Sequence, residues 1–380
     1  MGDGAKGDLD GLLVVSLEQA VAAPYAASRL ADAGARVIKI ERPEGDFARG
    51  YDADAKGFSS YFVWLNRGKE SVTLDLKQPA DLQIFKNILT KADVFIQNLM
   101  PGALERLGVT MDGLRAADPR LITCDISGYG STGPFAQMKA YDFLVQAEVG
   151  LAQITGAPEE PGRVGVSICD IAAGMTAHAA ILQALVARER TGEGRAIELS
   201  LFHALADWMN VPYLQHHYGG RQIRRPGLHH PTIAPYGAYG CGDGRMLLIS
   251  IQNEREWVRL SGEVLDQPGL ADDPRFSSNV NRVKNRGELD AIMNGVFARC
   301  SIDEIAAKLQ AAQIAFGRLN DMDEFTRHPQ NRFVFVRTSA GEVRLLSPGA
   351  VVNGQMPQLG AVPDLGEHSD SIRAEFSATG

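Results

Sequence analysis

The first half of the chain alternates short apolar runs with stretches that carry apolar residues on one helical face. Five runs rich in Val, Ile and Leu have the composition of strands, and they lie at 12–17, 36–41, 72–76, 94–99 and 121–127. Residues 26–34 and 79–92, which fall between them, have the apolar spacing of helices. Strands that alternate with helices predict a mostly parallel sheet covered by helices.

The second half begins near the most apolar helical stretch, residues 171–190, which the sequence TGEG ends. A strand that enters a further helix is predicted at 195–209. Residues 218–237 are dense in Gly, Pro and Arg and therefore indicate a linker. Beyond them, the sequence Gly-Asp-Gly at 242–244 indicates a hairpin, and SIDE at 301–304 is a capping box that starts a late helix.

The tail holds two further strand-like runs, at 331–338 and 342–349, which are enough to return to the first domain. We therefore predict an α/β protein with a large domain formed by residues 1–205 and 330–380. A linker is predicted at 206–225, and a smaller α+β domain at 226–329.

With 45% hydrophobic and 22% charged residues among 380, the chain has the composition of a soluble globular protein. No apolar run approaches the length that spans a bilayer, and the N-terminus is too polar for a secretory signal, so we expect a cytoplasmic protein with no membrane contact. The net charge of -8, without a long Lys/Arg run, argues against nucleic-acid binding. The four cysteines are scattered, so we expect reduced thiols and no metal site.

Residues 128–135 read GYGSTGPF and match the G-x-G-x-x-G pattern of dinucleotide-binding turns. That pattern binds a pyrophosphate only where a helix begins at once, so that its N–H groups face the ligand. Pro134 directly follows the last glycine, and the next helical pattern starts near Tyr141. We therefore interpret the segment as a turn beside another ligand.

The stretch VGVSICDIAAG places Asp170 between a β-like run and the long apolar helix. A carboxylate there faces the positive end of the helix dipole, which favours its ionised form, and an ionised carboxylate in a dry site can be a nucleophile. The alternative is that Asp170 is only the N-cap of the helix. Asp142 has the same two interpretations. Gly174, one turn into the helix, indicates that something approaches the helix closely there.

Over nearly its whole length the chain resembles the family III CoA-transferases, the group that includes formyl-CoA and carnitine CoA-transferases. The matching stretches follow the order of the family and lie at 17–51, 66–77, 92–108, 126–135, 141–151, 170–174, 189–201 and 365–370. The resemblance implies a Rossmann-like large domain built from the N-terminal part and the C-terminal tail, a small middle domain, and an interlocked homodimer.

The resemblance also implies the reaction. An aspartate at the position of Asp170 is the family's nucleophile, which takes CoA from an acyl-CoA as an aspartyl-CoA thioester and passes it to a free carboxylic acid. CoA is part of the substrate, so no permanently bound cofactor is expected. Formyl-CoA transferases cover the acyl site with a run of glycines. In their place this chain has only separated glycines, Gly237, Gly240, Gly242 and Gly244.

The positions that the family uses to bind CoA carry suitable residues. Arg and Lys suit the 3′-phosphate and the pyrophosphate, and an apolar strip suits the adenine. These positions are Ala20, Val21, Ala22, Arg42, Leu74, Lys77, Asn98, Leu99, Arg106, Lys139 and Tyr141. Without the resemblance, Arg42 and Lys77 would be interpreted as solvated strand ends. Val21 departs from formyl-CoA transferases, which have a glutamine near the reacting groups at that position.

By family position, Arg49 and Tyr51 face the acyl pocket, and His229 and His230 come near it. Cationic donors suit a substrate with a second carboxylate, because a buried carboxylate must be paired. We therefore expect short dicarboxylic acids as donor or acceptor. The alternative is that Arg49 forms an internal salt bridge and that the two histidines lie at the surface or at a dimer contact.

Three other functions can be weighed against CoA transfer. An α-methylacyl-CoA racemase of the same fold would need a His and a Glu where this chain has Tyr141 and Asn253, and these two cannot form that acid–base pair. A non-catalytic CoA-binding protein would keep the Arg and Lys contacts and lack the nucleophile. A nicotinamide oxidoreductase would need a glycine-rich turn after the first strand, where the chain reads LEQAVAAPYAA.

Overall fold

The computed structural model describes residues 7–377, which divide into two compact units. Of the described residues, the large unit contains 7–152, 163–221 and 332–377, and the small unit contains Gln153–Gly162 and Gln222–Asn331. The first part of the predicted linker is helical. Ser200 caps helix α8 (Leu201–Trp208), and α9 (Asn210–His217) follows at once, so the large unit extends through both helices.

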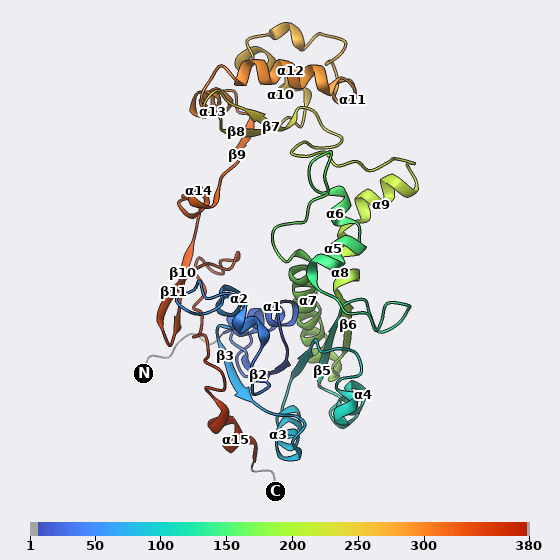
Figure 1. The fold of residues 1–380 in the computed structure, drawn as a ribbon, viewed down its shortest axis with the longest axis vertical. Helices are drawn as coiled ribbons and strands as arrows, with labels where there is room; N and C mark the ends of the chain where they lie inside the picture. The colour runs from blue at the N-terminus through green and yellow to red at the C-terminus, as the bar shows by residue number, and fades with distance from the viewer. Residues whose placement is uncertain (1–6, 378–380) are drawn as a thin grey trace. The chain divides into compact units, whose positions relative to one another are not determined.

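The large unit contains a six-stranded sheet in which all neighbouring strands are parallel (Figure 1). The spatial order is β3-β2-β1-β4-β5-β6, with bounds Lys69–Thr73, Arg36–Glu41, Leu13–Leu17, Val94–Gln97, Ile122–Ser127 and Ala196–Ser200. From β1 the chain adds β2 and β3 on one side of the sheet, and it then adds β4, β5 and β6 on the other side. The order of the strands therefore reverses between β1 and β4. In open parallel sheets, ligands bind outside the carboxyl ends of the strands at this reversal.

Helices cover both faces of this sheet. On one face, α1 (Ala22–Asp32) and α7 (Ile168–Thr191) pack with sheet residues such as Val14 in one hydrophobic cluster. On the other face, α3 (Pro79–Leu89) and the C-terminal α15 (Ser369–Ser377) share a second cluster with Val15. Adjacent residues of β1 thus face opposite layers, as the period of a strand requires.

Helix α7 is long and apolar enough, by length and composition, to cross a bilayer, which the search of the sequence for apolar runs did not indicate. In the large unit it instead packs against α1, α8 and the sheet. Ala173, Ala177 and Ile181 are fully buried there. Its composition is therefore that of a core helix of an α/β layer.

The close approach expected at Gly174 is made by helix α1. A Cβ built on Gly174 would lie 2.7 Å from the carbonyl oxygen of Ala22 and 2.8 Å from Cβ of Tyr25. The first is a backbone atom and the second is bonded directly to the backbone, so neither can move aside unless α1 moves. Gly174 therefore allows the two helices to pack at short distance.

Replacing Gly174 by Ala is expected to lower the free energy of unfolding by about 1 to 3 kcal/mol, because the added methyl overpacks the α1–α7 contact. Urea unfolding followed by circular dichroism measures this change. Gly295→Ala, in α12 (Arg286–Phe297), is the matched control, since its added Cβ meets no atom within 4 Å other than its chain neighbours and the nearby backbone of its own helix. The control should be neutral or stabilising, by up to about 1 kcal/mol. Equal destabilisation by both changes would contradict this interpretation.

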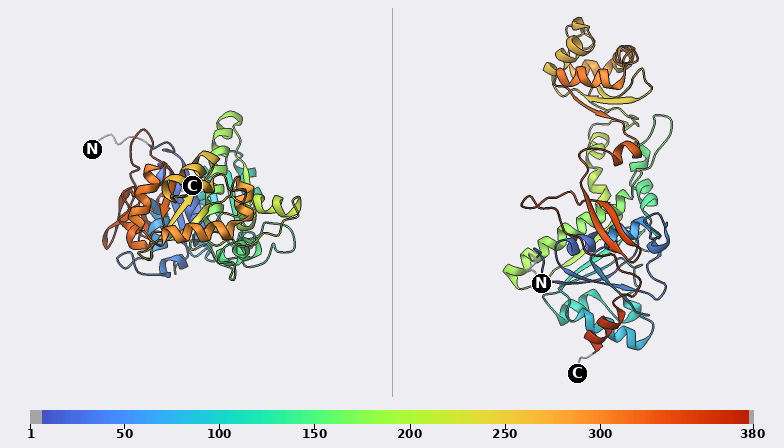
Figure 2. Two further views of the ribbon diagram at one scale, coloured as in Figure 1. Left: turned by 90° about the horizontal axis from the view of Figure 1, so that it is seen from above. Right: turned by 90° about the vertical axis from the view of Figure 1, so that its left-hand side faces the viewer.

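The C-terminal segment belongs to the large unit. Strands β10 (Phe333–Thr338) and β11 (Gly341–Leu346) form an antiparallel hairpin that packs on α2 (Ser60–Asn66). Helix α15, red in Figures 1 and 2, lies beside α3. Arg373 pairs with Asp81 of α3 at 2.6 Å, and Glu375 pairs with Arg36 of β2 at 2.7 Å. The end of the chain therefore closes one face of the sheet.

The small unit contains an antiparallel sheet of β7 (Tyr236–Gly240), β8 (Met246–Ser250) and β9 (Ala315–Arg318). The predicted hairpin joins β7 to β8, and the predicted capping box of Ser301 and Glu304 starts α13 (Ile302–Ala311); both predictions are confirmed. The four separated glycines all lie in this hairpin. The other helices of the two units are η1 (Phe47–Gly50), η2 (Glu105–Leu107), α4 (Met111–Ala117), α5 (Asp142–Glu148), α6 (Leu151–Ile154), α10 (Glu254–Arg259), η3 (Leu260–Val264), η4 (Pro268–Leu270), α11 (Asn279–Lys284) and α14 (Met322–Thr326).

Candidate active site

A cavity of about 530 Å³ lies in the large unit at the carboxyl ends of β1, β4 and β5. It therefore occupies the reversal of strand order at which open parallel sheets bind ligands. The predicted site residues in its lining are Ala20, Val21, Ala22, Tyr51, Asn98, Leu99, Lys139, Tyr141 and Asp170. They come from the turn after β1, the end of η1, the segment after β4, the segment before α5 and the start of α7, which are far apart in sequence.

Asp170 is not the N-cap of α7. The cap position is Ser167, so Asp170 lies in the first turn of the helix, partly buried and facing the cavity. Among residues 7–377, no group donates a hydrogen bond to its side-chain oxygens that would tie the carboxylate to a structural role. The simpler interpretation of Asp170 as a helix cap is therefore wrong.

Asp142 provides the missing cap. Its Oδ1 accepts hydrogen bonds from the backbone N–H of Cys169 at 2.8 Å and of Asp170 at 3.4 Å. Its Oδ2 accepts from the side-chain amide of Gln146 at 2.7 Å, and that amide oxygen accepts from the N–H of Val164. The two aspartates that the sequence left equivalent thus have different environments: Asp142 is held by three donors, and Asp170 is left free.

Burial and the negative charge of Asp142 raise the pKa of Asp170 to about 7. The sequence-based expectation was the opposite, because the helix N-terminus favours the ionised form. Here Asp142 already takes the free N–H groups at that end, so desolvation and like-charge repulsion prevail. A carboxylate with such a pKa is a stronger base and nucleophile than an ordinary aspartate while still ionising near neutral pH.

The turn between β1 and α1 forms one wall of the cavity and rests on a buried group of ionisable side chains. We call this group, Glu18, Lys39, Glu41, Asp46 and Lys69, the charged cluster; each residue is at most 5% exposed. Asp46 binds Lys39 at 2.9 Å, and Glu18 binds both lysines. Buried charges require such pairing, because an unpaired ion in the interior is costly.

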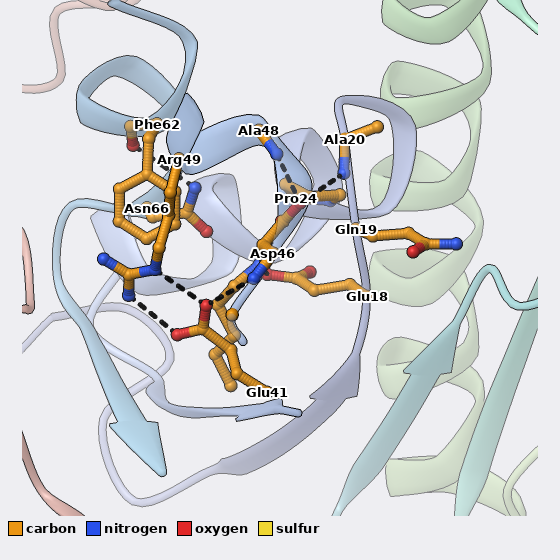
Figure 3. A network of polar contacts seen from close by, with 12 residues as sticks. Glu18, Gln19, Ala20, Pro24, Glu41, Asp46, Ala48, Arg49, Phe62 and Asn66 are labelled. Atoms are coloured by element: carbon orange, nitrogen blue, oxygen red, sulfur yellow. Dashed lines mark hydrogen bonds and ion pairs between the residues drawn. The ribbon is translucent and has the colours of Figure 1, made fainter. Parts of the chain in front are cut away.

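Arg49 is engaged inside the protein. Its guanidinium forms two hydrogen bonds of 2.8 Å with the carboxylate of Glu41 and lies 3.7 Å above the ring of Phe62 (Figure 3). Burial alone would raise the pKa of Glu41, but the hydrogen bond from Arg49 and the charge of Lys39 lower this pKa to about 2. Arg49 does not line the cavity, so the structure favours the internal salt bridge that the sequence left open.

Four of the positions predicted to bind CoA lie outside the cavity lining. Leu74 is buried in the core of the sheet. Arg42, Lys77 and Arg106 are exposed, and they follow the carboxyl ends of β2, β3 and β4 respectively. The segments that carry them therefore start from the same edge of the sheet as the cavity.

His229 and His230 belong to the small unit. Nδ1 of His229 is buried without a hydrogen-bond partner among the described residues, beside Gly237. The ring of His230 stacks on Tyr236, with ring centroids 5.0 Å apart. These contacts are local to the small unit, and the part of both histidines in the acyl pocket stays a prediction.

The GYGSTGPF segment follows β5 without a helix, as its proline predicts; α5 begins only at Asp142. Gly128 lines the cavity that holds Asp170. Ser131 and Thr132 line a second cavity of about 660 Å³, whose lining includes several carboxylates. Burial, together with Glu198 and Glu105, raises the pKa of one of them, Asp125, to about 6.

The sequence did not indicate several other lining residues, notably Gln19, Tyr61, Phe143, Arg163 and Ser167. Arg163 lies over the ring of Phe143 at 5.3 Å, and its Nε donates to the carbonyl of Val164. Lys139 and Arg163 are the cationic side chains of this lining. No sequence motif surrounds Arg163, and only its position in the folded chain brings it to the cavity.

Tyr51 and Tyr61 form an aromatic pair in the lining, with ring centroids 5.5 Å apart. Burial, with the charges of Asp46 and Asp170, raises the pKa of Tyr51 to about 12. Its hydroxyl therefore stays protonated at neutral pH and can donate a hydrogen bond into the cavity.

Comparison with known proteins agrees with this geometry. The sequence model of the family described as CoA-transferase family III matches residues 9–369. The acetyl-CoA:oxalate CoA-transferase of Acetobacter aceti is 34% identical over 98% of this chain and 97% of its own length. The succinate–glutarate CoA-transferase of Agrobacterium fabrum is 32% identical over 98% of this chain and 96% of its own length. The crystal structure of a CAIB/BAIF family protein from Brucella suis matches with a TM-score of 0.85 and 33% identity, over 98% of this chain and 100% of that one.

Proposed function

The chain belongs to CoA-transferase family III, and from this membership we propose that Asp170 is the residue that carries CoA between two acids. The protein is an enzyme that moves CoA from an acyl-CoA to a free carboxylic acid. The observation that carries the proposal is that the two aspartates at the start of α7 have different partners: Asp142 caps the helix, and Asp170 faces the cavity with a free carboxylate.

In the first half-reaction, a carboxylate oxygen of Asp170 attacks the thioester carbonyl of the donor acyl-CoA. The C–S bond breaks, and a mixed anhydride and the CoA thiolate form. The thiolate then attacks the carbonyl of Asp170, which releases the donor acid as its carboxylate and leaves an aspartyl-CoA thioester. No proton is gained or lost in these steps, so the cavity needs no separate acid or base.

In the second half-reaction, the acceptor carboxylate attacks the aspartyl thioester and expels CoA thiolate. The thiolate attacks the acceptor carbonyl of the new anhydride, which yields the acceptor acyl-CoA and restores ionised Asp170. The thioester energy is conserved throughout because water does not enter. A partly buried Asp170 in a cavity that Tyr51 and Tyr61 also line supports this exclusion of water.

CoA carries a 3′-phosphate and a pyrophosphate, and both require cationic partners. We assign this role to Arg42, Lys77, Arg106 and Lys139. The first three are exposed at the carboxyl edge of the sheet, and Lys139 lines the cavity itself. Their arrangement suits a ligand whose thioester lies at Asp170 and whose phosphates extend outwards along that edge.

We further propose that the acids are short dicarboxylic acids. Two similar proteins are named for oxalate, succinate and glutarate, which are dicarboxylic acids. Arg163 supports this proposal from the structure. It lines the same cavity as Asp170, and no carboxylate of the described residues pairs with it. It can therefore bind the second carboxylate of a dicarboxylic acid, the one that does not react. The sequence suggests Arg49 for this role.

Replacing Arg163 by Gln is expected to lower kcat/KM for a dicarboxylic acceptor by about tenfold to a hundredfold, because a charge-assisted hydrogen bond is lost. For a monocarboxylic acid of equal length the change should stay within about threefold. Acceptor panels with one acyl-CoA donor measure both values. Arg163→Lys should retain part of the preference, and Lys139→Gln is the matched control that weakens acyl-CoA binding whatever the acid. An equal loss for both acids in Arg163→Gln would contradict the assignment.

The transfer itself is tested by incubating the protein with acyl-CoAs and isotopically labelled free acids and following the labelled acyl-CoA by mass spectrometry. Appearance of labelled acyl-CoA without ATP is the expected result. Hydroxylamine added during turnover should convert Asp170 into its hydroxamate, which peptide mass spectrometry locates. Labelled product with no modification at Asp170 would disprove the aspartyl intermediate and leave the transferase activity standing.

The racemase alternative gains no support from the site. Tyr141 is 64% exposed at the start of α5. The side chain of Asn253 caps α10 by accepting the N–H of Glu256 at 3.0 Å, so it already has a structural task. Neither side chain is an acid or base suited to removing an α-proton at neutral pH.

We also propose that two chains form the family's interlocked homodimer. Large apolar side chains are exposed along α7, α8 and α9, among them Met175, Trp208, Tyr213 and Leu214. Such clusters usually mark protein interfaces. Light scattering should give twice the mass of one chain, and a monomer active at full rate would exclude this assembly.

A further inference from the structure

The turn that joins β1 to α1 contains a backbone conformation that its residue disfavours. Ala20 has φ = 64°, in the left-handed region where a Cβ meets the neighbouring carbonyl oxygen. Such a conformation persists only where its surroundings enforce it, and it is typical of functional sites. The groups that enforce it here can be identified one by one.

Asp46 holds Ala20 directly. Its Oδ1 accepts hydrogen bonds from the N–H of Ala20 at 3.2 Å and of Ala48 at 2.9 Å (Figure 3). Its Oδ2 accepts a hydrogen bond from Nζ of Lys39 at 2.9 Å. Every contact of this carboxylate is therefore to a buried or backbone donor. Asp46 does not line the cavity and cannot itself touch a ligand there.

The neighbouring residue is held from the other side. Asn98 accepts from the N–H of Gln19 at 2.9 Å and donates to its carbonyl at 2.8 Å, so both backbone groups of Gln19 are fixed. In Figure 3 the side chain of Gln19 projects away from the charged cluster. The turn is thus clamped at two consecutive residues, and Asp46 is the clamp at the strained one.

Asp46 is in turn supported by residues that the reaction does not use. Its own N–H donates to Oε1 of Glu41 at 3.1 Å, and Arg49 binds the same carboxylate with two hydrogen bonds. This series of contacts runs from Arg49 to Ala20 through the interior of the large unit. It gives the buried charges of this unit a purpose beyond neutralising one another.

Gln19 and Ala20, which these contacts fix, line the cavity that contains Asp170, and so do the next two residues, Val21 and Ala22. We propose that Asp46 is a positioning residue for CoA transfer: it keeps Ala20 in the left-handed conformation and so holds this wall of the cavity in the shape that receives acyl-CoA. This inference rests on the proposed function of the cavity. It assigns no contact with substrate to Asp46.

The test compares buried Asp46 with Asp93, a partly buried aspartate that binds the same kinds of partner at the opposite end of β1. Asp46→Ala removes the acceptor beside Ala20, and Asp46→Asn keeps an acceptor oxygen and removes the charge. Asp93→Ala and Asp93→Asn are the matched controls, because Asp93 binds the N–H of Leu13 at 2.9 Å and Arg188 at 3.0 Å at the amino end of β1. All four variants are compared in melting temperature, kcat and KM for acyl-CoA.

Asp46→Ala is expected to raise KM for acyl-CoA by about tenfold or more, while the Asp93 variants lower the melting temperature and leave KM within about twofold. Asp46→Asn should show a smaller rise in KM, and it carries the test if Asp46→Ala does not fold. Adding Ala20→Gly to Asp46→Ala should recover part of the lost affinity, since glycine adopts φ = 64° without a Cβ penalty. Equal KM changes in the Asp46 and Asp93 variants, or no recovery by glycine, would overturn the proposal.

Direct binding of CoA, measured by titration calorimetry, separates this inference from the proposed function. If the wild-type protein binds CoA but transfers it to no acid, the proposed reaction fails, and the Asp46 and Asp93 variants can still be compared in affinity. If transfer proceeds and Asp46→Ala binds CoA as the wild type does, the positioning role fails alone.

Discussion

Replacing Asp170 by Asn is expected to lower kcat by about a thousandfold or more, because an amide cannot attack a thioester or carry CoA as a thioester. The cavity should still bind acyl-CoA, so KM should change far less than kcat. Rates of CoA exchange at saturating donor and acceptor, with circular dichroism to confirm folding, measure this loss. A folded Asp170→Asn protein that transfers CoA at the normal rate would disprove the mechanism.

The same change should leave the protein at least as stable as the wild type. The folded structure raises the pKa of Asp170 to about 7, above the ordinary value near 3.8 that applies when the chain is unfolded. A raised carboxyl pKa contributes stability that is present below the unfolded pKa and is lost as the pH rises through about 7. At about pH 8 the ionised wild-type carboxylate therefore opposes folding, and Asn removes that opposition. Thermal unfolding at high and low pH, compared between the two proteins, measures this difference.

The second large effect is a steep acid limb in the pH profile. Since ionised Asp170 is the nucleophile and its pKa is about 7, kcat/KM should fall as the pH drops below neutrality. At pH 5 the rate should be about a hundredfold below its plateau, because it falls tenfold for each pH unit below the pKa. Rates between pH 5 and about 9, with enzyme integrity checked at each pH, define the limb.

Asp142→Asn should shift this limb to lower pH. The amide oxygen can still accept the N–H of Cys169 and cap α7, but the negative charge that helps to raise the pKa of Asp170 is gone. Part of the upward shift should remain, since burial is its larger cause. Asp112→Asn, which alters an exposed carboxylate of α4, is the control and should leave the limb in place. An unchanged limb in Asp142→Asn would show that the charge of Asp142 does not act on the nucleophile.

The sheet was predictable where its strands bury apolar side chains on both faces. The runs that became β1, β2, β4 and β5 are rich in Val and Ile, and their composition sufficed. The sequence predicts the third strand at 72–76, whereas β3 spans Lys69–Thr73. The apolar pattern misses its start because the sequence Lys-Glu-Ser has the composition of a solvated segment. Lys69 is buried because its ammonium binds Glu18 after the end of β1, the carbonyl of Pro24 and the side chain of Asn66. In the sheet β1 lies beyond β2 from β3, so the pattern around Lys69 does not reveal Glu18.

The position of the site was predictable from the sequence, but the hydrogen bonding and the pKa of its nucleophile were not. The sequence located Asp170 at the start of α7, and the resemblance gave it a role. Its freedom from hydrogen bonds and part of the rise in its pKa depend on Asp142, which is 28 residues away and reaches α7 only in the folded chain. Arg49 shows the converse. Family position carries an arginine to the neighbourhood of the site, but the partner that occupies it, Glu41, is fixed by the packing of β2.

The docking of α15 has a consequence for how the protein is made. Ile372 and Phe376 complete the hydrophobic cluster beneath β1 and β2, and Arg373 and Glu375 fasten them to Asp81 and Arg36. A ribosome therefore delivers the first strands of the sheet more than three hundred residues before α15, which covers part of one of their faces. Until α15 emerges, the part of that face that α3 does not cover stays apolar and open, so a nascent chain of this protein depends on chaperones or on fast synthesis to escape aggregation.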